Sequence, residues 1–141
     1  MQLMSDGGKK KEQNMKKDVL LKNSGMQLTA DNNDLSDPEP IEIIAPGEYY
    51  FKNGKHYILY DEFMEGFDSV TKNVLKLQQD SLEITKRGSS NVHMIFEKDK
   101  KNMTCYTTPF GSLMMGIDAR SISIQESEEE LHAQIEYALD V

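Results

Sequence analysis

The sequence predicts an all-β protein, and three observations carry the prediction. An Asn53-Gly54 pair lies between aromatic and β-branched runs, which favours a two-residue type I′ hairpin turn. From residue 71 to residue 124, apolar residues repeatedly alternate with polar ones, as in strands with one buried face. Roughly nine or ten such short runs are joined by short turns with barely any helical pattern, so an antiparallel barrel or sandwich is expected.

The predicted strands follow from these runs in chain order. They span residues 18–29, 41–44, 49–51, 57–60, 71–78, 81–87, 92–96, 104–108, 113–117 and 122–124. Pro46 and Gly47 should end the second of them, because proline cannot donate to a ladder and glycine favours turns. Residues 61–70 have no clean period and fit either an irregular connection or one helical turn.

The stretch from Thr104 to Gly116 is predicted to be a hairpin corner. Strand-forming threonines and Tyr106 precede Pro109, Gly111 can take a positive φ, and a second apolar run then begins. Within its first half, Thr104, Tyr106 and Thr108 share one face of the strand.

Local pattern leaves the last segment, residues 127–139, ambiguous. Ser127 with Glu130 fits a helix capping box, whereas Leu131, Ile135 and Leu139 fit both a helical stripe and, with the residues between them, a period of two. A sheet of this kind needs a final strand to close on the first, because an uncovered edge invites aggregation. The segment is therefore predicted to be a strand.

Composition sets the domain plan. A chain of 141 residues suits a single domain. The first 14 residues are rich in Gly, Lys and polar types, and Met15 could be a second start, so residues 1–14 are expected to be a disordered native extension or cloning remnant before a single β domain at 15–141. The single Cys105 excludes an internal disulfide.

Charge and hydropathy indicate which classes of binding partner are not expected. Residues 1–17 carry +3 of the net −8, so the remainder of the chain carries −11. An acidic domain repels phosphate backbones and anionic lipid, so neither nucleic-acid binding nor membrane-surface binding is expected. No apolar run approaches the roughly 20 residues of a membrane span, and no secretory signal is evident. We expect a cytoplasmic protein.

The order of several short motifs resembles a known family. These motifs are residues 60–62, 71–76, 87–88 and 106–111, Met94 with Phe96, and Tyr137 with Leu139. Together they resemble the bacterial YwiB-like family of unknown function over about residues 15–141. The resemblance implies a small calycin-like (lipocalin-like) β-barrel of 8–10 strands, mostly an up-and-down meander. It implies no catalytic residue, because the family has no established activity.

Polar residues on strand faces give the candidate site. Period two places Tyr60 with Glu62, and Tyr106 with Thr108, on single strand faces. If these faces and that of Arg87 all point inward, Glu62 and Arg87 can pair beneath the two phenols. Such a pocket would suit a small polar or anionic ligand without catalysis. The alternative is ordinary packing of the tyrosines and a solvated pair at the rim.

Other chemistry is weakly indicated. Cys105 with His93 could form a nucleophile and base, but no orienting acid can be placed, so enzymatic activity is uncertain and disfavoured. His56, His93 and His132 lack metal-ligand spacing, so no metal or cofactor is expected. The second hypothesis is a packed barrel that binds a protein partner, or itself, through an exposed strand edge or the acidic run at 126–130.

Overall fold

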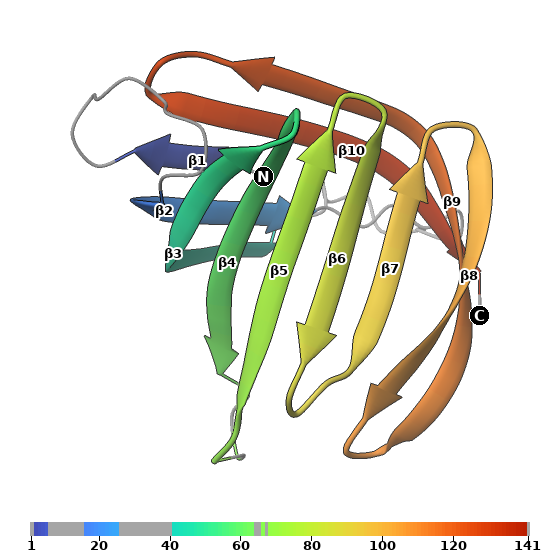
Figure 1. Cartoon of the computed structure of the whole chain (residues 1–141). Helices are drawn as coiled ribbons and strands as arrows, with labels where there is room; N and C mark the ends of the chain where they lie inside the picture. Colours follow the sequence, from blue (N-terminus) through green and yellow to red (C-terminus); the bar gives the residue numbers. More distant parts are fainter. Residues whose placement is uncertain (1, 6–15, 26–40, 64–65, 67, 141) are drawn as a thin grey trace, which may run out of the picture.

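The structure is a computed structural model that describes residues 2–5, 16–25, 41–63, 66 and 68–140. Within these ranges the chain forms ten β-strands and no helix (Figure 1). The strands are β1 Gln2–Ser5, β2 Lys17–Gly25, β3 Ile41–Lys52, β4 Lys55–Phe63, β5 Val70–Gln78, β6 Ser81–Arg87, β7 Val92–Glu97, β8 Lys100–Thr108, β9 Gly111–Glu126 and β10 Glu130–Asp140. No helix able to cross a membrane occurs in this part of the chain.

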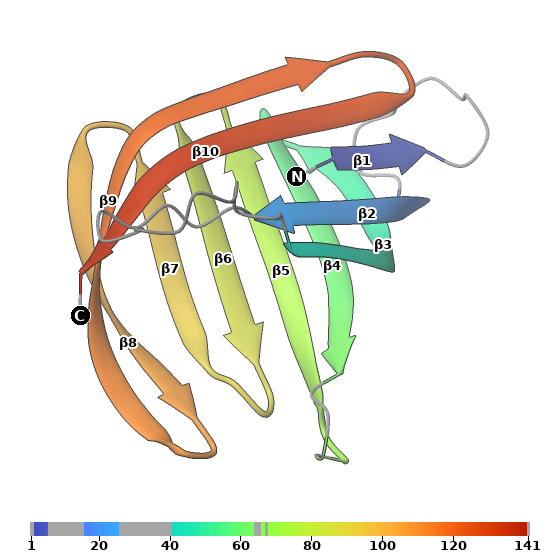
Figure 2. The same ribbon diagram turned by 180° about the vertical axis from the view of Figure 1, so that it is seen from behind.

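All ten strands belong to one antiparallel sheet in the order β7-β6-β5-β4-β3-β2-β1-β10-β9-β8. Consecutive strands are neighbours almost throughout, which confirms the predicted all-β meander. The sheet curls so that the long, bent β9 and β10 pass over the ends of the strands from β4 to β7 (Figures 1 and 2). One face of the sheet is therefore turned inward.

Local turn chemistry explains the hairpins that the sequence predicts. Asn53 and Gly54 both have positive φ, 53° and 77°, as a type I′ turn requires. Gly111 has a φ of 136° where the Thr104–Gly116 corner turns from β8 into β9. The ambiguous C-terminal segment forms β10, which confirms the predicted strand, and Ser127 caps the turn before it by accepting from the Glu130 amide at 3.1 Å.

Two expectations about the N-terminal half are wrong for the described residues. Residues 2–5, expected to be disordered, form β1 and pair with both β2 and β10. Their main chain completes two ladders that β2 and β10 would otherwise leave open. Residues 6–14 lie outside the described part of the chain.

The second wrong expectation is the break at Pro46 and Gly47, because β3 runs unbroken through both. The β3–β4 pairing begins at Gly47, so the missing amide of Pro46 interrupts no bond to β4. Gly47 fits because a side chain there would meet the Leu59 carbonyl oxygen, 2.8 Å from the position of a Cβ.

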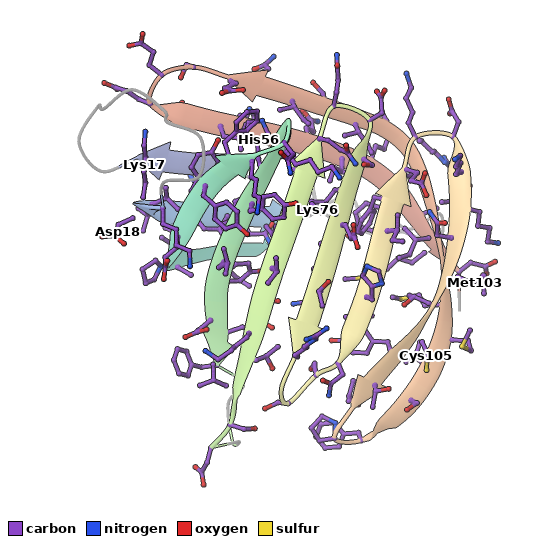
Figure 3. All side chains as sticks on the ribbon, in the orientation of Figure 1. Lys17, Asp18, His56, Lys76, Met103 and Cys105 are labelled. Carbon is purple, nitrogen blue, oxygen red and sulfur yellow. The ribbon has the colours of Figure 1, made fainter. Side chains whose placement is uncertain are left out.

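The hydrophobic core covers the inner face of the sheet. Ile58, Leu77 and Ile117 are fully buried, and partly buried residues such as Ile84 and Met94 pack against the same cluster. At one end of the core, His56 is buried (Figure 3) and its Nδ1 lies 2.8 Å from the Tyr49 hydroxyl. Burial raises the pKa of Tyr49, so this phenol stays protonated as a hydrogen-bond partner.

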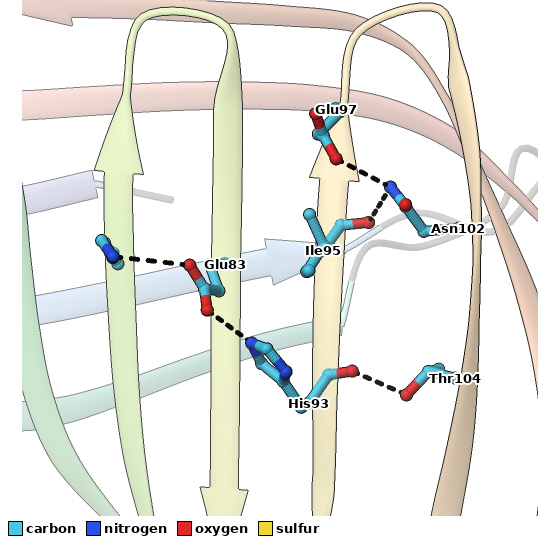
Figure 4. Close-up of polar contacts among 7 residues, drawn as sticks. Glu83, His93, Ile95, Glu97, Asn102 and Thr104 are labelled. Carbon is cyan, nitrogen blue, oxygen red and sulfur yellow. Dashed lines mark hydrogen bonds and ion pairs between the residues drawn. The ribbon is translucent and has the colours of Figure 1, made fainter.

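Strands β7 and β8 are consecutive but do not form a ladder within the described residues. One isolated bridge joins them, with hydrogen bonds of 2.8 and 2.9 Å between the main chains of Asn91 and Thr107. Elsewhere side chains span the gap: Thr104 donates to the His93 carbonyl at 2.6 Å and Asn102 to the Ile95 carbonyl at 3.0 Å (Figure 4). The sheet is thus linked around this seam without a continuous ladder.

This seam predicts uneven hydrogen exchange along β7. The amides of His93 and Ile95 face β8, because their carbonyls are the ones that accept from β8 side chains. We expect these two amides to exchange at least about tenfold faster than those of Met94 and Phe96, which face the β6 ladder. Exchange measured by NMR tests this pattern. Equal protection of all four amides would indicate a closed β7–β8 ladder.

Candidate functional site

Polar side chains replace the aliphatic core at one end of the inner face. Three alternate register rows of β4 and β5, those with side chains on the inner face, mark the change: Ile58 pairs with Leu75, Tyr60 with Asn73, and Glu62 with Thr71. We call the group at this end the inner polar cluster, and its members are Tyr60, Glu62, Thr71, Asn73, Lys86 and Ser90. Burying polar groups is costly unless they are paired or used, so this end of the sheet is the candidate site.

An ion pair crosses the cluster diagonally from β6 to β4. Lys86 Nζ lies 3.2 Å from Oε1 and 3.4 Å from Oε2 of Glu62. The Lys86 side chain is only 16% exposed and that of Glu62 is 36% exposed. The ammonium group is therefore largely withdrawn from water and depends on this carboxylate for compensation.

Asn73 lies at the centre of the cluster, between Tyr60 on β4 and Lys86 on β6. The residue is 1% exposed, and its Nδ2 donates to the Thr71 carbonyl at 3.3 Å. Its Oδ1 has no hydrogen-bond partner and is the only such buried side-chain atom in the described part of the chain. A buried acceptor left in this way costs about 1–3 kcal/mol.

Two hydroxyl groups lie near Asn73, those of Thr71 and Tyr60, and the structure indicates the hydrogen bonding of the first and the protonation of the second. Thr71 is 2% exposed, and its Oγ1 accepts from the Ser90 amide at 3.3 Å. Burial, and then the nearby charge of Glu62, raises the pKa of Tyr60 to about 12. Tyr60 therefore keeps its proton at physiological pH and can donate a hydrogen bond.

Arg87 does not take the position that the predicted pocket gives it. On β6 the buried Leu82 fixes the inward set, so Lys86 points inward and Arg87 is exposed on the outer face opposite Lys72. The predicted Glu62–Arg87 pair is replaced by Glu62–Lys86. The alternation of Leu82, Ile84 and Lys86 contained this signal, because an apolar residue anchors the inward face of a strand.

Tyr106 and Thr108 lie on the inner side of β8, as their shared face predicts, and both are half-buried. Continuing the Asn91–Thr107 bridge by one residue places Tyr106 opposite Val92, which pairs with Lys86. Tyr106 thus extends the row of the cluster across the seam. Thr108 instead stabilises the hairpin turn: its hydroxyl accepts from the Phe110 amide and donates to the Gly111 carbonyl, each at 3.1 Å.

A second polar group lies on the outer face near the seam (Figure 4). Glu83 contacts the His93 ring through Nε2 and Lys76 Nζ at 3.7 Å. Glu83 is thus an acid beside His93, which the sequence could not place. Cys105 is exposed on the same face opposite Met114 (Figure 3), and no hydrogen bond joins it to His93 in the described part of the chain.

The outer pair makes a testable prediction about charge. The hydrogen bond from His93, above all, holds the pKa of Glu83 below its ordinary value of 4.5. Replacing His93 with asparagine should raise that pKa toward 4.5, and a carbon-detected NMR titration of the carboxyl would measure it. Because the pKa is lowered by folding, the associated stability is present above pH 4.5 and is lost on acidification below it. An unchanged pKa in the variant would contradict the contact.

The described residues contain no group of three or more His, Cys, Asp and Glu side chains placed to hold a metal ion. The protein is an antiparallel ten-stranded β meander, and one end of the inner face of its sheet is polar.

Comparison with known proteins agrees with this class. Residues 23–141 match the family described as domain of unknown function DUF1934, and the chain belongs to that family. Its structure is similar to the crystal structure of ywiB protein from Bacillus subtilis, with a TM-score of 0.74 and 22% sequence identity over 89% of this chain and 83% of that chain. At this identity the likeness concerns the fold alone. No curated protein matches the chain.

Proposed function

We propose that this protein is a noncatalytic calycin-like barrel that binds a small polar or anionic ligand at the inner polar cluster. The observation that carries the proposal is the unpartnered Oδ1 of Asn73, buried beside an ion pair on the inner face. In an ordinary packed core, a buried acceptor such as Asn73 Oδ1 would have a hydrogen-bond partner, and a largely buried lysine such as Lys86 would be rare. A ligand with a donor for Asn73 Oδ1 and an acceptor for Lys86 Nζ would pair both groups.

The barrel itself is part of the proposal. Its support is the seam between β7 and β8, where the Asn91–Thr107 bridge and the bonds from Asn102 and Thr104 hold two edge strands together. Small barrels of eight or more strands can hold one small ligand inside. A seam held by few bonds would allow the strands to separate and admit it.

The test is a thermal-shift screen of metabolites followed by native mass spectrometry. We expect at least one compound to stabilise the protein and to form a one-to-one adduct. Lys86→Met keeps the aliphatic stem but removes the inward charge, and it should abolish the shift. Arg87→Met, the matched control on the outer face, should leave it intact. Absence of any adduct or shift, or an equal loss in both variants, would count against the site.

The same seam favours a second candidate function. The His93 and Ile95 carbonyls accept from side chains of β8 and not from its main-chain amides. Such an edge could accept an extended segment of a protein partner by β-strand addition. This function predicts that a captured partner protects the His93 and Ile95 amides from exchange. A partner that instead requires the exposed acidic residues 126–130, as shown by loss of binding in lysine variants, would point to the acidic face.

A further inference from the structure

The orientation of the Asn73 amide is fixed by its neighbour. A main-chain carbonyl can only accept, so the side-chain atom 3.3 Å from the Thr71 carbonyl must be the nitrogen. The amide oxygen Oδ1 therefore points away from the Thr71 carbonyl, and only a hydrogen-bond donor can pair with it. No described group supplies that donor.

The flanking residues in the same register row are donors. Asn73 pairs with Tyr60 of β4 on one side and with Lys86 of β6 on the other. Tyr60 is a protonated phenol, and Lys86 has three N–H bonds, of which the two Glu62 oxygens can take two. The row therefore reads donor, acceptor, donor, with the short Asn73 between two longer side chains that can converge above it.

The charges at the site disfavour an anionic ligand. Lys86 and Glu62 neutralise each other at 3.2 Å, and an anion approaching Lys86 would lie beside the Glu62 carboxylate. An uncharged ligand meets no such repulsion. Of the two ligand kinds in the proposed function, the polar, uncharged one is thus favoured.

We infer that the ligand is an uncharged cyclic imide or ureide, whose C=O, N–H and C=O groups present an acceptor, a donor and an acceptor along one edge to Tyr60, Asn73 and Lys86. This inference rests on the proposed function, because it names the ligand class for the same site. A carboxylic acid or a tertiary amide offers acceptors but no donor to Asn73. A site built to hydrogen-bond a ligand binds analogues that lack the donor more weakly, because its buried acceptor is then left unpaired.

Three small molecules with one carbon skeleton test the inference on the unmodified protein. Succinimide has the full edge, N-methylsuccinimide lacks the donor, and succinate is anionic without a donor. Each is titrated into ¹⁵N-labelled protein while the side-chain amide of Asn73 is followed by NMR. We expect succinimide to shift that amide with a Kd of about 1–20 mM, as its seven non-hydrogen atoms allow. The N-methyl compound and succinate should bind at least about tenfold more weakly, since each leaves Asn73 unpaired.

The outcomes separate the ligand class from the site. If succinate or N-methylsuccinimide shifts the Asn73 amide as strongly as succinimide, the imide class is wrong and the site stands. If all three leave the cluster unperturbed at 100 mM, well above the expected Kd of about 1–20 mM, both the class and the site are wrong. Asn73→Leu has the same branching and should abolish the succinimide shifts at Lys86 and Tyr60, whereas Arg87→Met should preserve them.

Discussion

Replacing Gly88 with alanine is expected to destabilise the protein by about 3–5 kcal/mol, from overpacking and a strained φ together. Gly88 has a φ of 142°, which residues with a side chain rarely adopt. A Cβ there would lie 2.2 Å from the Val70 carbonyl oxygen and 2.8 Å from Thr71 Cα. Both are backbone atoms, so the clash is relieved only by moving the start of β5 away from the end of β6. The loss should appear in urea denaturation as a lower midpoint.

Gly111 is a matched control, because its φ is 136° and no atom lies within 4 Å of the position that a Cβ would take there. Gly111→Ala should cost only the strain of the backbone, about 1–3 kcal/mol. The difference between the two variants measures how closely β5 and β6 approach at the inner polar cluster. Equal losses in the two variants would mean that this approach is looser than the structure has it.

Replacing Glu62 with glutamine is expected to cost about 1–2 kcal/mol, because Lys86 then keeps a charge that is largely withdrawn from water. The figure lies below that of a fully buried pair, since the Glu62 side chain is 36% exposed. Adding Lys86→Met should restore much of the loss by removing the uncompensated charge. A double-mutant cycle in denaturant measures the coupling between the two residues.

The control for this pair is one residue away on the opposite face. Asp61 and Lys72 lie 3.8 Å apart, with side chains 52% and 79% exposed. Asp61→Asn should change stability by less than about 0.5 kcal/mol, as exposed pairs usually do. If Asp61→Asn and Glu62→Gln have the same small effect, the inner polar cluster is as wet as the outer surface and the pair gives no evidence of a special site.

Where a tight turn joins two paired strands, the sequence was sufficient to predict the hairpin. The Asn53-Gly54 turn and the Thr104–Gly116 corner have local causes, namely positive φ and a non-donating proline. β1 was missed because it is held by main-chain pairing with β2 and β10, which leaves no pattern in the side chains. The Lys- and Gly-rich residues that follow it favoured the prediction of disorder. The break expected at Pro46 failed because whether a proline breaks a strand depends on which neighbour needs its amide.

The same distinction applies to the site. Tyr60 and Glu62 could be grouped by period two, since they share a strand with the buried Ile58. Arg87 was placed in the pocket on the condition that its face of β6 points inward, but the buried Leu82 gives the inward face to the alternate residues, which include Lys86. Asn73 gave no local signal at all. Its importance comes from long-range register, which puts it between Tyr60 and Lys86, and from an acceptor left unpaired.

The most direct test of the inner polar cluster as a ligand site is a high-resolution crystal structure of the protein purified gently from its producing cells. We predict electron density for a bound molecule larger than water, with a donor within hydrogen-bonding distance of Asn73 Oδ1 and an acceptor near Lys86 Nζ. A structure in which Asn73 Oδ1 is satisfied by the protein's own side chains, with the space above it filled by Tyr60 and Tyr106, would contradict the proposed site.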